Sequence, residues 1–235
     1  TMKARARQRT FFNKQVEPNI CILDPISFSP AEIDFLLRRG GDKHAEAGFW
    51  NQFEHADTFG SLIQPDPELT VRLKQHIAQL DDGGDILLAE VLDWAGRVIE
   101  QSEYLVNRYA VVVANPPYMG AKNMDRRLAE FANELYPNSK PDLFAMFIER
   151  CLGLAAQHGC VAMITMQSWM FLSSYEKLRQ RLLSEAPVSS MLHLGARAFD
   201  SIGGEVVATA AFVLESDGNE HAESVFVRTV DCGDE

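Results

Sequence analysis

The chain has 235 residues, of which 46% are hydrophobic and 23% charged, a composition typical of a globular protein that buries a core. No apolar run approaches the roughly 18 residues of a membrane-spanning helix, and no signal peptide begins the chain, so we expect no membrane association. The net charge of −11 disfavours strong binding of duplex DNA by this chain alone, because phosphate contacts need clustered Lys and Arg.

The cysteines and histidines give no sign of a metal site. Cys21, Cys151, Cys160 and Cys232 lack CxxC spacing, and the six histidines lack a spacing such as HExxH. We therefore expect reduced thiols, no bound metal and a cytoplasmic protein.

The first half of the chain is predicted to be mainly helical. Asn19–Leu23 is a candidate buried strand. Ser29 and Glu32 form a capping box that starts a helix at Pro30, and Gly40-Gly41 ends it. Two further helices are expected, at Pro67–Leu80 and Ile86–Val106. Because these helices interrupt the strand pattern, we interpret residues 26–106 as a helical insertion.

The second half, residues 107–235, alternates between strands and helices. The expected elements, in chain order, are a strand at Tyr109–Ala114, helices at Met124–Leu135 and from Asp142 to about Gln157, a strand at Cys160–Met166, a capped helix at Ser173–Glu185, and strands at Val188–Leu194, Glu205–Leu214 and Ser224–Val230. Tyr109–Ala114 is uniformly apolar, as in strands buried on both faces of a parallel sheet. The last two strands are expected to pair as an antiparallel hairpin. The fold class is therefore α/β, the C-terminal part of a Rossmann-like, doubly wound sheet with a terminal hairpin.

The candidate catalytic motif is the tetrapeptide Asn115-Pro116-Pro117-Tyr118, which directly follows the strand at Tyr109–Ala114. Ligands of open α/β sheets bind at the carboxyl ends of strands. Two prolines fix the backbone, so a rigid carbonyl and the Asn115 side-chain oxygen can accept both hydrogens of a planar NH2 group. When both hydrogens are accepted in this way, the amino nitrogen is drawn out of conjugation with its ring, and its lone pair becomes available to attack a methyl group. Tyr118 offers a flat face on which a ring can stack.

This tetrapeptide resembles motif IV of amino-methyltransferases that use S-adenosylmethionine, in which asparagine at the first position goes mainly with adenine N6. Phe199, followed by Gly203-Gly204-Glu205, resembles their motif VIII, where an aromatic residue stacks on the other face of a flipped-out adenine. An ordinary core role for Phe199 is an equal alternative. Segments 109–123, 149–172 and 196–215 together resemble the PglX-like adenine-specific methyltransferases of BREX phage-defence systems.

The resemblance implies S-adenosylmethionine as methyl donor, double-stranded DNA as substrate in the full-length protein, and other phage-defence proteins as possible partners. The sequence lacks the acidic and glycine-rich motif I, so the resemblance implies that a cofactor-binding half precedes Thr1 and that the whole chain, 1–235, is a partial methyltransferase domain, inactive alone. Asp57 is a candidate contact for the cofactor adenine, although a surface carboxylate is the simpler interpretation.

Two alternatives stay open. The same tetrapeptide could present a glutamine side-chain amide, as in release-factor methyltransferases, since that group is also a planar NH2. The chain could also bind DNA or a defence partner without catalysis. A half-domain should expose apolar surface and could therefore self-associate.

Overall fold

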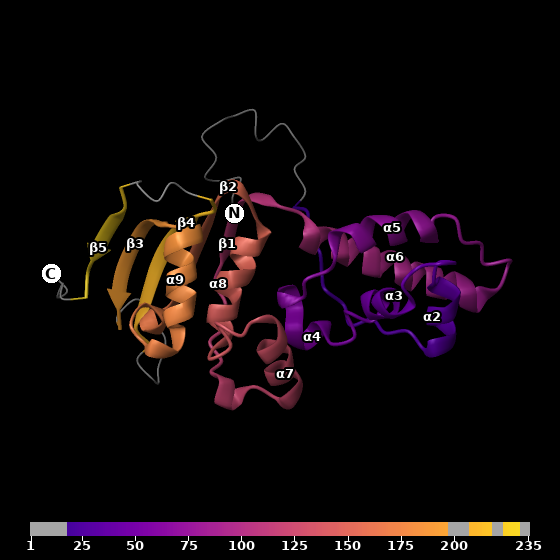
Figure 1. Cartoon of the computed structure of the whole chain (residues 1–235), viewed down its shortest axis with the longest axis horizontal. Helices are drawn as coiled ribbons and strands as arrows, with labels where there is room; N and C mark the ends of the chain where they lie inside the picture. Colours follow the sequence, from indigo (N-terminus) through magenta and orange to yellow (C-terminus); the bar gives the residue numbers. More distant parts are fainter. Residues whose placement is uncertain (1–17, 197–206, 218–222, 231–235) are drawn as a thin grey trace.

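The computed structural model describes residues 18–196, 207–217 and 223–230. We call residues 18–106 the helical part and the described residues from 107 onward the sheet part; they lie side by side along the long axis of the molecule (Figure 1). The elements of the helical part are α2 (Pro30–Leu36), α3 (Lys43–Trp50), α4 (Ala56–Phe59), η2 (Gly60–Leu62), α5 (Pro67–Ile77) and α6 (Ile86–Val106). Those of the sheet part are β1 (Tyr109–Ala114), η3 (Ala121–Asn123), α7 (Arg126–Leu135), α8 (Leu143–Leu154), β2 (Ala155–Met166), η4 (Gln167–Met170), η5 (Ser173–Tyr175), α9 (Glu176–Glu185), β3 (Val188–Gly195), β4 (Thr209–Glu215) and β5 (Val225–Arg228). Among the described helices, none is long and apolar enough to cross a bilayer.

The helical part has its own hydrophobic core and well-defined helix starts. Ser29 and Glu32 form the predicted capping box of α2, and aspartates cap α3, α5 and α6. The amphipathic α6 spans the predicted range and buries Val91, Ala95 and Val98 against aromatic residues such as Trp50 and Phe53. Side-chain caps thus explain where these helices begin, and one apolar stripe per helix explains how they pack around the core.

The predicted strand at Asn19–Leu23 is wrong. Ile20 and Ile22 are 73% and 72% exposed, and the segment runs beside α6, where the Gln101 side chain accepts a hydrogen bond from the Asp24 amide at 2.6 Å. A strand needs a partner strand for its backbone groups, and none of the described strands lies there.

The sheet part contains one five-stranded sheet in the order β1-β2-β4-β3-β5. β1 and β2 are parallel, β4 is antiparallel to both β2 and β3, and β5 is parallel to β3. The predicted α/β, Rossmann-like class is confirmed, but the terminal hairpin is wrong. β4 does not pair with β5, because β4 finds two partners in the middle of the sheet and β5 can then join only the free edge of β3.

The two faces of the sheet differ. Figure 1 shows α8 and α9 on one face, where Val161, Met163 and Phe212 belong to the core. On the other face, sheet residues line an apolar hollow of about 550 Å³. Val111 and Val113 on that face are 62% and 75% exposed, so the prediction that β1 is buried on both faces is wrong for this chain. Burial of the second face needs a further layer, and the described residues supply none.

Several element boundaries differ from the sequence prediction: α2 ends at Leu36 rather than at Gly40-Gly41, and α5 ends at Ile77 rather than at Leu80. α8 ends at Leu154 rather than near Gln157, because residues 155–159 join β2 through an irregular register against β1. Gly159 allows this: a Cβ there would lie 3.0 Å from the Tyr109 carbonyl oxygen and 2.9 Å from that of Ala156. The predicted capping box at Ser173 is wrong, since Ser173–Tyr175 forms the separate turn η5.

A buried polar contact joins the two parts. Arg150 of α8 donates to the carbonyl oxygens of Ser61 at 2.7 Å and Leu105 at 2.9 Å, and the Tyr136 hydroxyl donates to that of Leu62 at 2.8 Å. Burial lowers the pKa of Arg150 and raises the pKa of Tyr136 to about 12. Both groups thus keep donating to the helical part at neutral pH.

Candidate functional site

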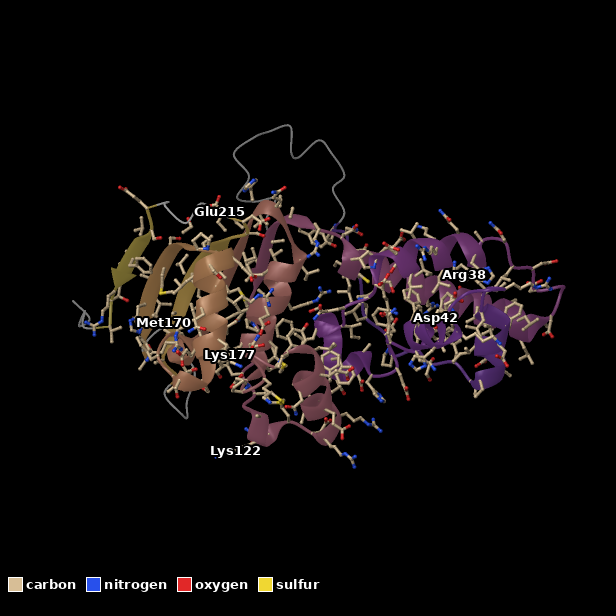
Figure 2. The ribbon with its side chains drawn as sticks, in the orientation of Figure 1. Arg38, Asp42, Lys122, Met170, Lys177 and Glu215 are labelled. Carbon is tan, nitrogen blue, oxygen red and sulfur yellow. The ribbon has the colours of Figure 1, made fainter. Side chains whose placement is uncertain are left out.

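The tetrapeptide 115–118 lies at the carboxyl end of β1, where the sequence predicts it. Since β1 and β2 are parallel, the turn that follows β2 lies at the same edge of the sheet. Figure 2 shows Lys122 and Met170 at this edge, and Glu215, the last residue of the antiparallel β4, at the opposite end. The carboxyl edge therefore gathers the loops that follow β1 and β2, as in other open α/β sheets.

Asn115 faces the uncovered side of the sheet. It continues the alternation of Val111 and Val113 and lines the apolar hollow together with Ala162 and Ile164. Its amide is exposed and makes no hydrogen bond to any described residue. The next residue, Pro116, is buried, so the backbone is anchored while the Asn115 side chain stays available to a ligand.

The Tyr118 side chain packs against α8. Its ring lies edge-on to that of Phe144, with centroids 6.1 Å apart and an interplanar angle of 89°. Burial and, to a lesser degree, the nearby Asp142 carboxyl raise the pKa of Tyr118. The hydroxyl therefore stays neutral at physiological pH, and the ring is held in one orientation beside Asn115.

Asp142 connects this loop to α8. Its Oδ1 caps the helix by accepting from the Phe144 amide at 3.2 Å, and it also accepts from the Met119 amide at 3.0 Å. In return, the Leu143 amide donates to the Met119 carbonyl oxygen at 3.0 Å. Burial raises the pKa of the Asp142 carboxyl, although the hydrogen bonds that it accepts from backbone amides lower it in part.

The sequence identifies Asp142 only as a helix cap. Its bond to Met119, one residue after the tetrapeptide, joins positions 23 residues apart, and no local pattern predicts it. Asp142 is therefore the residue of this site that the sequence prediction missed.

A second hollow at the carboxyl edge follows β2. It measures about 400 Å³ and is lined by Gln167, Ser168 and Phe171, among others. The Gln167 side chain is hydrogen-bonded to the His193 ring of β3, and the Gln167 backbone amide donates to the Ala208 carbonyl oxygen at 2.9 Å. The predicted stacking residue Phe199 lies outside the described residues, so its role remains a prediction.

Asp57 lies on α4 in the helical part and is far from the tetrapeptide in the sequence. Its carboxyl is exposed, contacts the Thr58 hydroxyl at 3.5 Å, and does not line the hollow beside Asn115. The role of Asp57 as a cofactor contact thus remains a prediction.

The α/β fold with this turn at its carboxyl edge is that of a Rossmann-like methyltransferase core, and comparisons narrow the class. The model of the family described as "Eco57I restriction-modification methylase" matches residues 37–199. The chain belongs to this family.

Two relatives with curated descriptions are more specific. The chain is 46% identical over 186 residues to "Adenine-specific methyltransferase BrxX" of Escherichia coli O9:H4 (strain HS), covering 78% of this chain and 15% of the relative. It is 36% identical over 240 residues to "Adenine-specific methyltransferase PglX" of Lacticaseibacillus casei (strain Zhang), covering 98% of this chain and 20% of the relative. The chain thus spans about a fifth or less of the length of these relatives.

Among solved structures, the chain is similar to the cryo-EM structure of the DrdV–DNA complex, with 13% identity and a TM-score of 0.41 over 60% of this chain and 16% of that one.

Proposed function

We propose that this chain is the target-base part of a DNA adenine-N6 methyltransferase. The observation that carries the proposal is Asn115: an exposed amide without a hydrogen-bond partner among the described residues, anchored by buried Pro116 at the carboxyl edge of the sheet. A rigid acceptor of this kind suits an amino group with two donor hydrogens. The two adenine-specific relatives, at 46% and 36% identity, support adenine as the base.

In this proposal, the chain's own residues bind and orient the base. The Asn115 side-chain oxygen and the Pro116 carbonyl oxygen accept the two hydrogens of the adenine amino group. The Tyr118 ring, held by Phe144, stacks on the base, and Phe199 is proposed for the opposite face. Preorganised acceptors stabilise the positive charge that develops on the amino nitrogen as it forms its new bond to carbon.

S-adenosylmethionine is the methyl donor that the family implies. We place its main contacts outside this chain, because the sequence has no glycine-rich motif I, and we retain Asp57 as a candidate contact with the adenine of the cofactor. Double-stranded DNA is the proposed substrate, which implies a cytoplasmic location. The likeness to BREX methyltransferases supports the further proposal that the full-length protein marks host DNA in phage defence and acts with other defence proteins.

The test is methylation by the full-length protein of an oligonucleotide duplex, with the product nucleosides analysed for N6-methyladenine. Asn115→Ala should lower the rate about a hundredfold, the effect of losing one preorganised group that acts on a transition state. Asn107→Ala is the matched control, since Asn107 is also exposed but lies at the amino end of the same strand. An equal effect of both substitutions would contradict the role of Asn115.

The same experiment separates the alternatives. Methyl transfer to a glutamine-containing peptide but not to DNA would show that the acceptor is an amide. No transfer to either, with DNA binding retained, would show a binding module without catalysis.

A further inference from the structure

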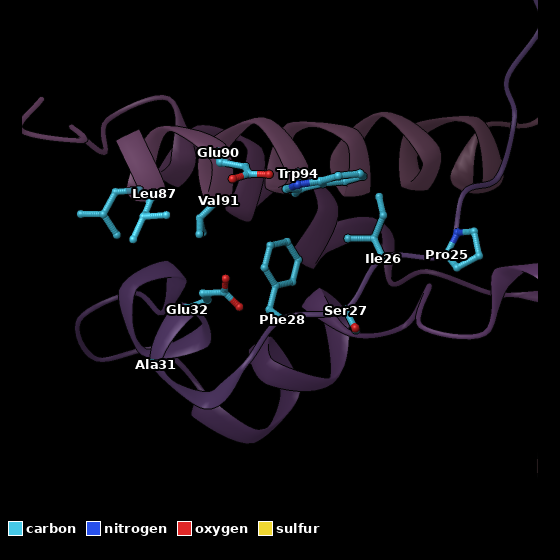
Figure 3. A pocket seen from close by; sticks show the side chains of 11 residues that line it. Pro25, Ile26, Ser27, Phe28, Ala31, Glu32, Leu87, Glu90, Val91 and Trp94 are labelled. Atoms are coloured by element: carbon cyan, nitrogen blue, oxygen red, sulfur yellow. The ribbon is translucent and has the colours of Figure 1, made fainter. Parts of the chain in front are cut away.

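The helical part contains an apolar groove that the proposed methyl-transfer site does not use. It lies between α2 and the N-terminal half of α6 and has a volume of about 540 Å³. Figure 3 shows the Trp94 ring lying across the groove above Phe28 and Ile26. Phe28 and Ile26 are buried, so the floor of the groove is part of the core.

The groove is preformed. The Phe28 ring lies edge-on to Trp50, with centroids 6.2 Å apart, and the Arg97 guanidinium lies 4.8 Å from the centre of the Trp94 ring. Each of these aromatic side chains therefore has a contact that fixes its plane. A ligand would not have to order them, which lowers the entropy cost of binding.

Two aliphatic side chains extend the apolar surface to the start of α6. Ile86 and Leu87 are 83% and 71% exposed, and Leu87 also lines the groove. Exposing two large consecutive aliphatic residues beside an apolar groove adds nothing to the stability of the chain itself. An exposed apolar side chain such as Leu87 at an apolar groove is typical of binding sites.

The rim of the groove is acidic. Glu32 and Glu90 line it, and Asp85 caps α6 beside it. The hydrogen bonds from Ser29 lower the pKa of Glu32, so this carboxylate is ionised at neutral pH. None of the three forms an ion pair with a described residue.

The surrounding surface has the same sign. The helical part has 16 Asp and Glu against 6 Lys and Arg, a net charge of −10. Four of the basic residues, Arg38, Arg72, Lys74 and Arg97, are already paired with carboxylates of the same part. The field around the groove therefore attracts a basic ligand and repels both nucleic acid and a second copy of the chain.

We propose that this groove binds a basic amphipathic helix of a partner protein. Apolar side chains of the helix, spaced by three and four residues, would fill the groove and contact Leu87 and Trp94. Lys and Arg side chains at the edges of that helix would face Glu32 and Glu90.

The test uses the 235-residue chain and a fluorescein-labelled peptide of about 18 Leu and Lys residues, with the Leu placed on one helical face. Its control is a scrambled peptide of the same composition. Fluorescence anisotropy should show micromolar binding of the patterned peptide and much weaker binding of the scrambled one. Trp94 fluorescence should change on binding, since the other two tryptophans, Trp50 and Trp169, are buried.

Variants locate the binding. Leu87→Gln should weaken it roughly tenfold by removing buried apolar area, and Glu90→Lys should weaken it several-fold by reversing a rim charge. Val71→Gln is the matched control, since Val71 is an exposed aliphatic residue of α5 outside the groove. Circular dichroism of each variant verifies the fold.

Several results would overturn the proposal. Equal binding of patterned and scrambled peptides would show charge attraction without a groove, and so would an unchanged affinity of Leu87→Gln. No binding at about a hundred micromolar would exclude a helix of this chemistry. A dimer in sedimentation that Leu87→Gln abolishes would show that the occupant is a second copy of the chain.

Discussion

The helical and sheet parts are similar in size but differ in net charge and in how completely their hydrophobic residues are covered. The helical part has a net charge of −10, whereas the described residues of the sheet part have 10 acidic and 10 basic residues, a net of zero. The helical part surrounds its core, and the sheet part leaves one face uncovered in the described chain. The overall charge of −11 therefore hides a division: the helical part would repel a polyanion, whereas the described residues of the sheet part, with no net charge, would not.

The contact between the parts gives the largest expected effect. Arg150→Met keeps much of the aliphatic volume but leaves the carbonyl oxygens of Ser61 and Leu105 without a donor. We expect a loss of about 3 kcal/mol in the free energy of unfolding, measured by urea denaturation of the chain. Arg72→Met, which removes an exposed ion pair with Glu68, should change stability by less than about 1 kcal/mol. Similar losses for both variants would show that Arg150 does not couple the parts.

Asp142→Ala is expected to have the next largest effect, on the sheet part alone. It removes the acceptor for the Met119 and Phe144 amides, so the free energy of unfolding should fall by about 2 kcal/mol. In the full-length protein the rate of methylation should fall as well, because Tyr118 loses its support. Asp125→Ala, which removes the cap of α7 without touching the loop, is the control for capping alone. If Asp125→Ala lowered the methylation rate equally, a positioning role for Asp142 would be untenable.

The charge division predicts which basic residues DNA contacts. Arg127 of α7 and Arg39 after α2 are both exposed and form no ion pair with a described residue. Arg127→Ala should weaken DNA binding by the full-length protein several-fold and lower the salt dependence of log K by about one. Arg39→Ala should leave both unchanged or slightly improve affinity. The opposite order would mean that DNA lies along the helical part.

The smallest expected effect is a pH dependence at Asp142. Since burial raises the pKa of this carboxyl, the folded chain holds its proton at pH values where the unfolded chain has lost it. The wild type should therefore lose stability as the pH rises from the ordinary aspartate pKa of 3.8 to the raised value, and gain none above it. The amide that the Asp142→Asn substitution introduces does not titrate, so the stability of this variant relative to wild type should rise over the same window. Urea midpoints measured across the acid range provide the comparison, and a constant difference would contradict the direction of the shift.

The sequence predicted best where local signals and burial agree. The capping box at Ser29, the helix at Ile86–Val106 and the turn at Asn115 depend on neighbours in the sequence, and all three lie where they were expected. Most failures lie where a distant segment decides, although the local capping box predicted at Ser173 is also wrong. The place of β4 between β2 and β3, and the exposure of Asn19–Leu23, depend on which edges are free once the sheet forms.

The candidate site divides in the same way. Asn115, Pro116, Pro117 and Tyr118 form one contiguous motif, so the sequence alone could propose them. Asp142 joins that motif only through a hydrogen bond across 23 residues, which no periodicity encodes. The roles of Asp57 and Phe199 depend on a likeness to other proteins and stay predictions.

The position of β4 has a consequence for the order in which the chain can assemble during synthesis. β3 is joined to β2 only through β4, whose residues leave the ribosome after those of β3. At roughly 5–20 residues per second, the stretch from 196 to 208 delays that step by about one to three seconds. Until then, β1 and β2 can pair, while β3 has no partner among the earlier strands. A polypeptide truncated before Thr209 would thus keep the tetrapeptide but lose the strand that closes the sheet, and it should be a preferred target for proteolysis.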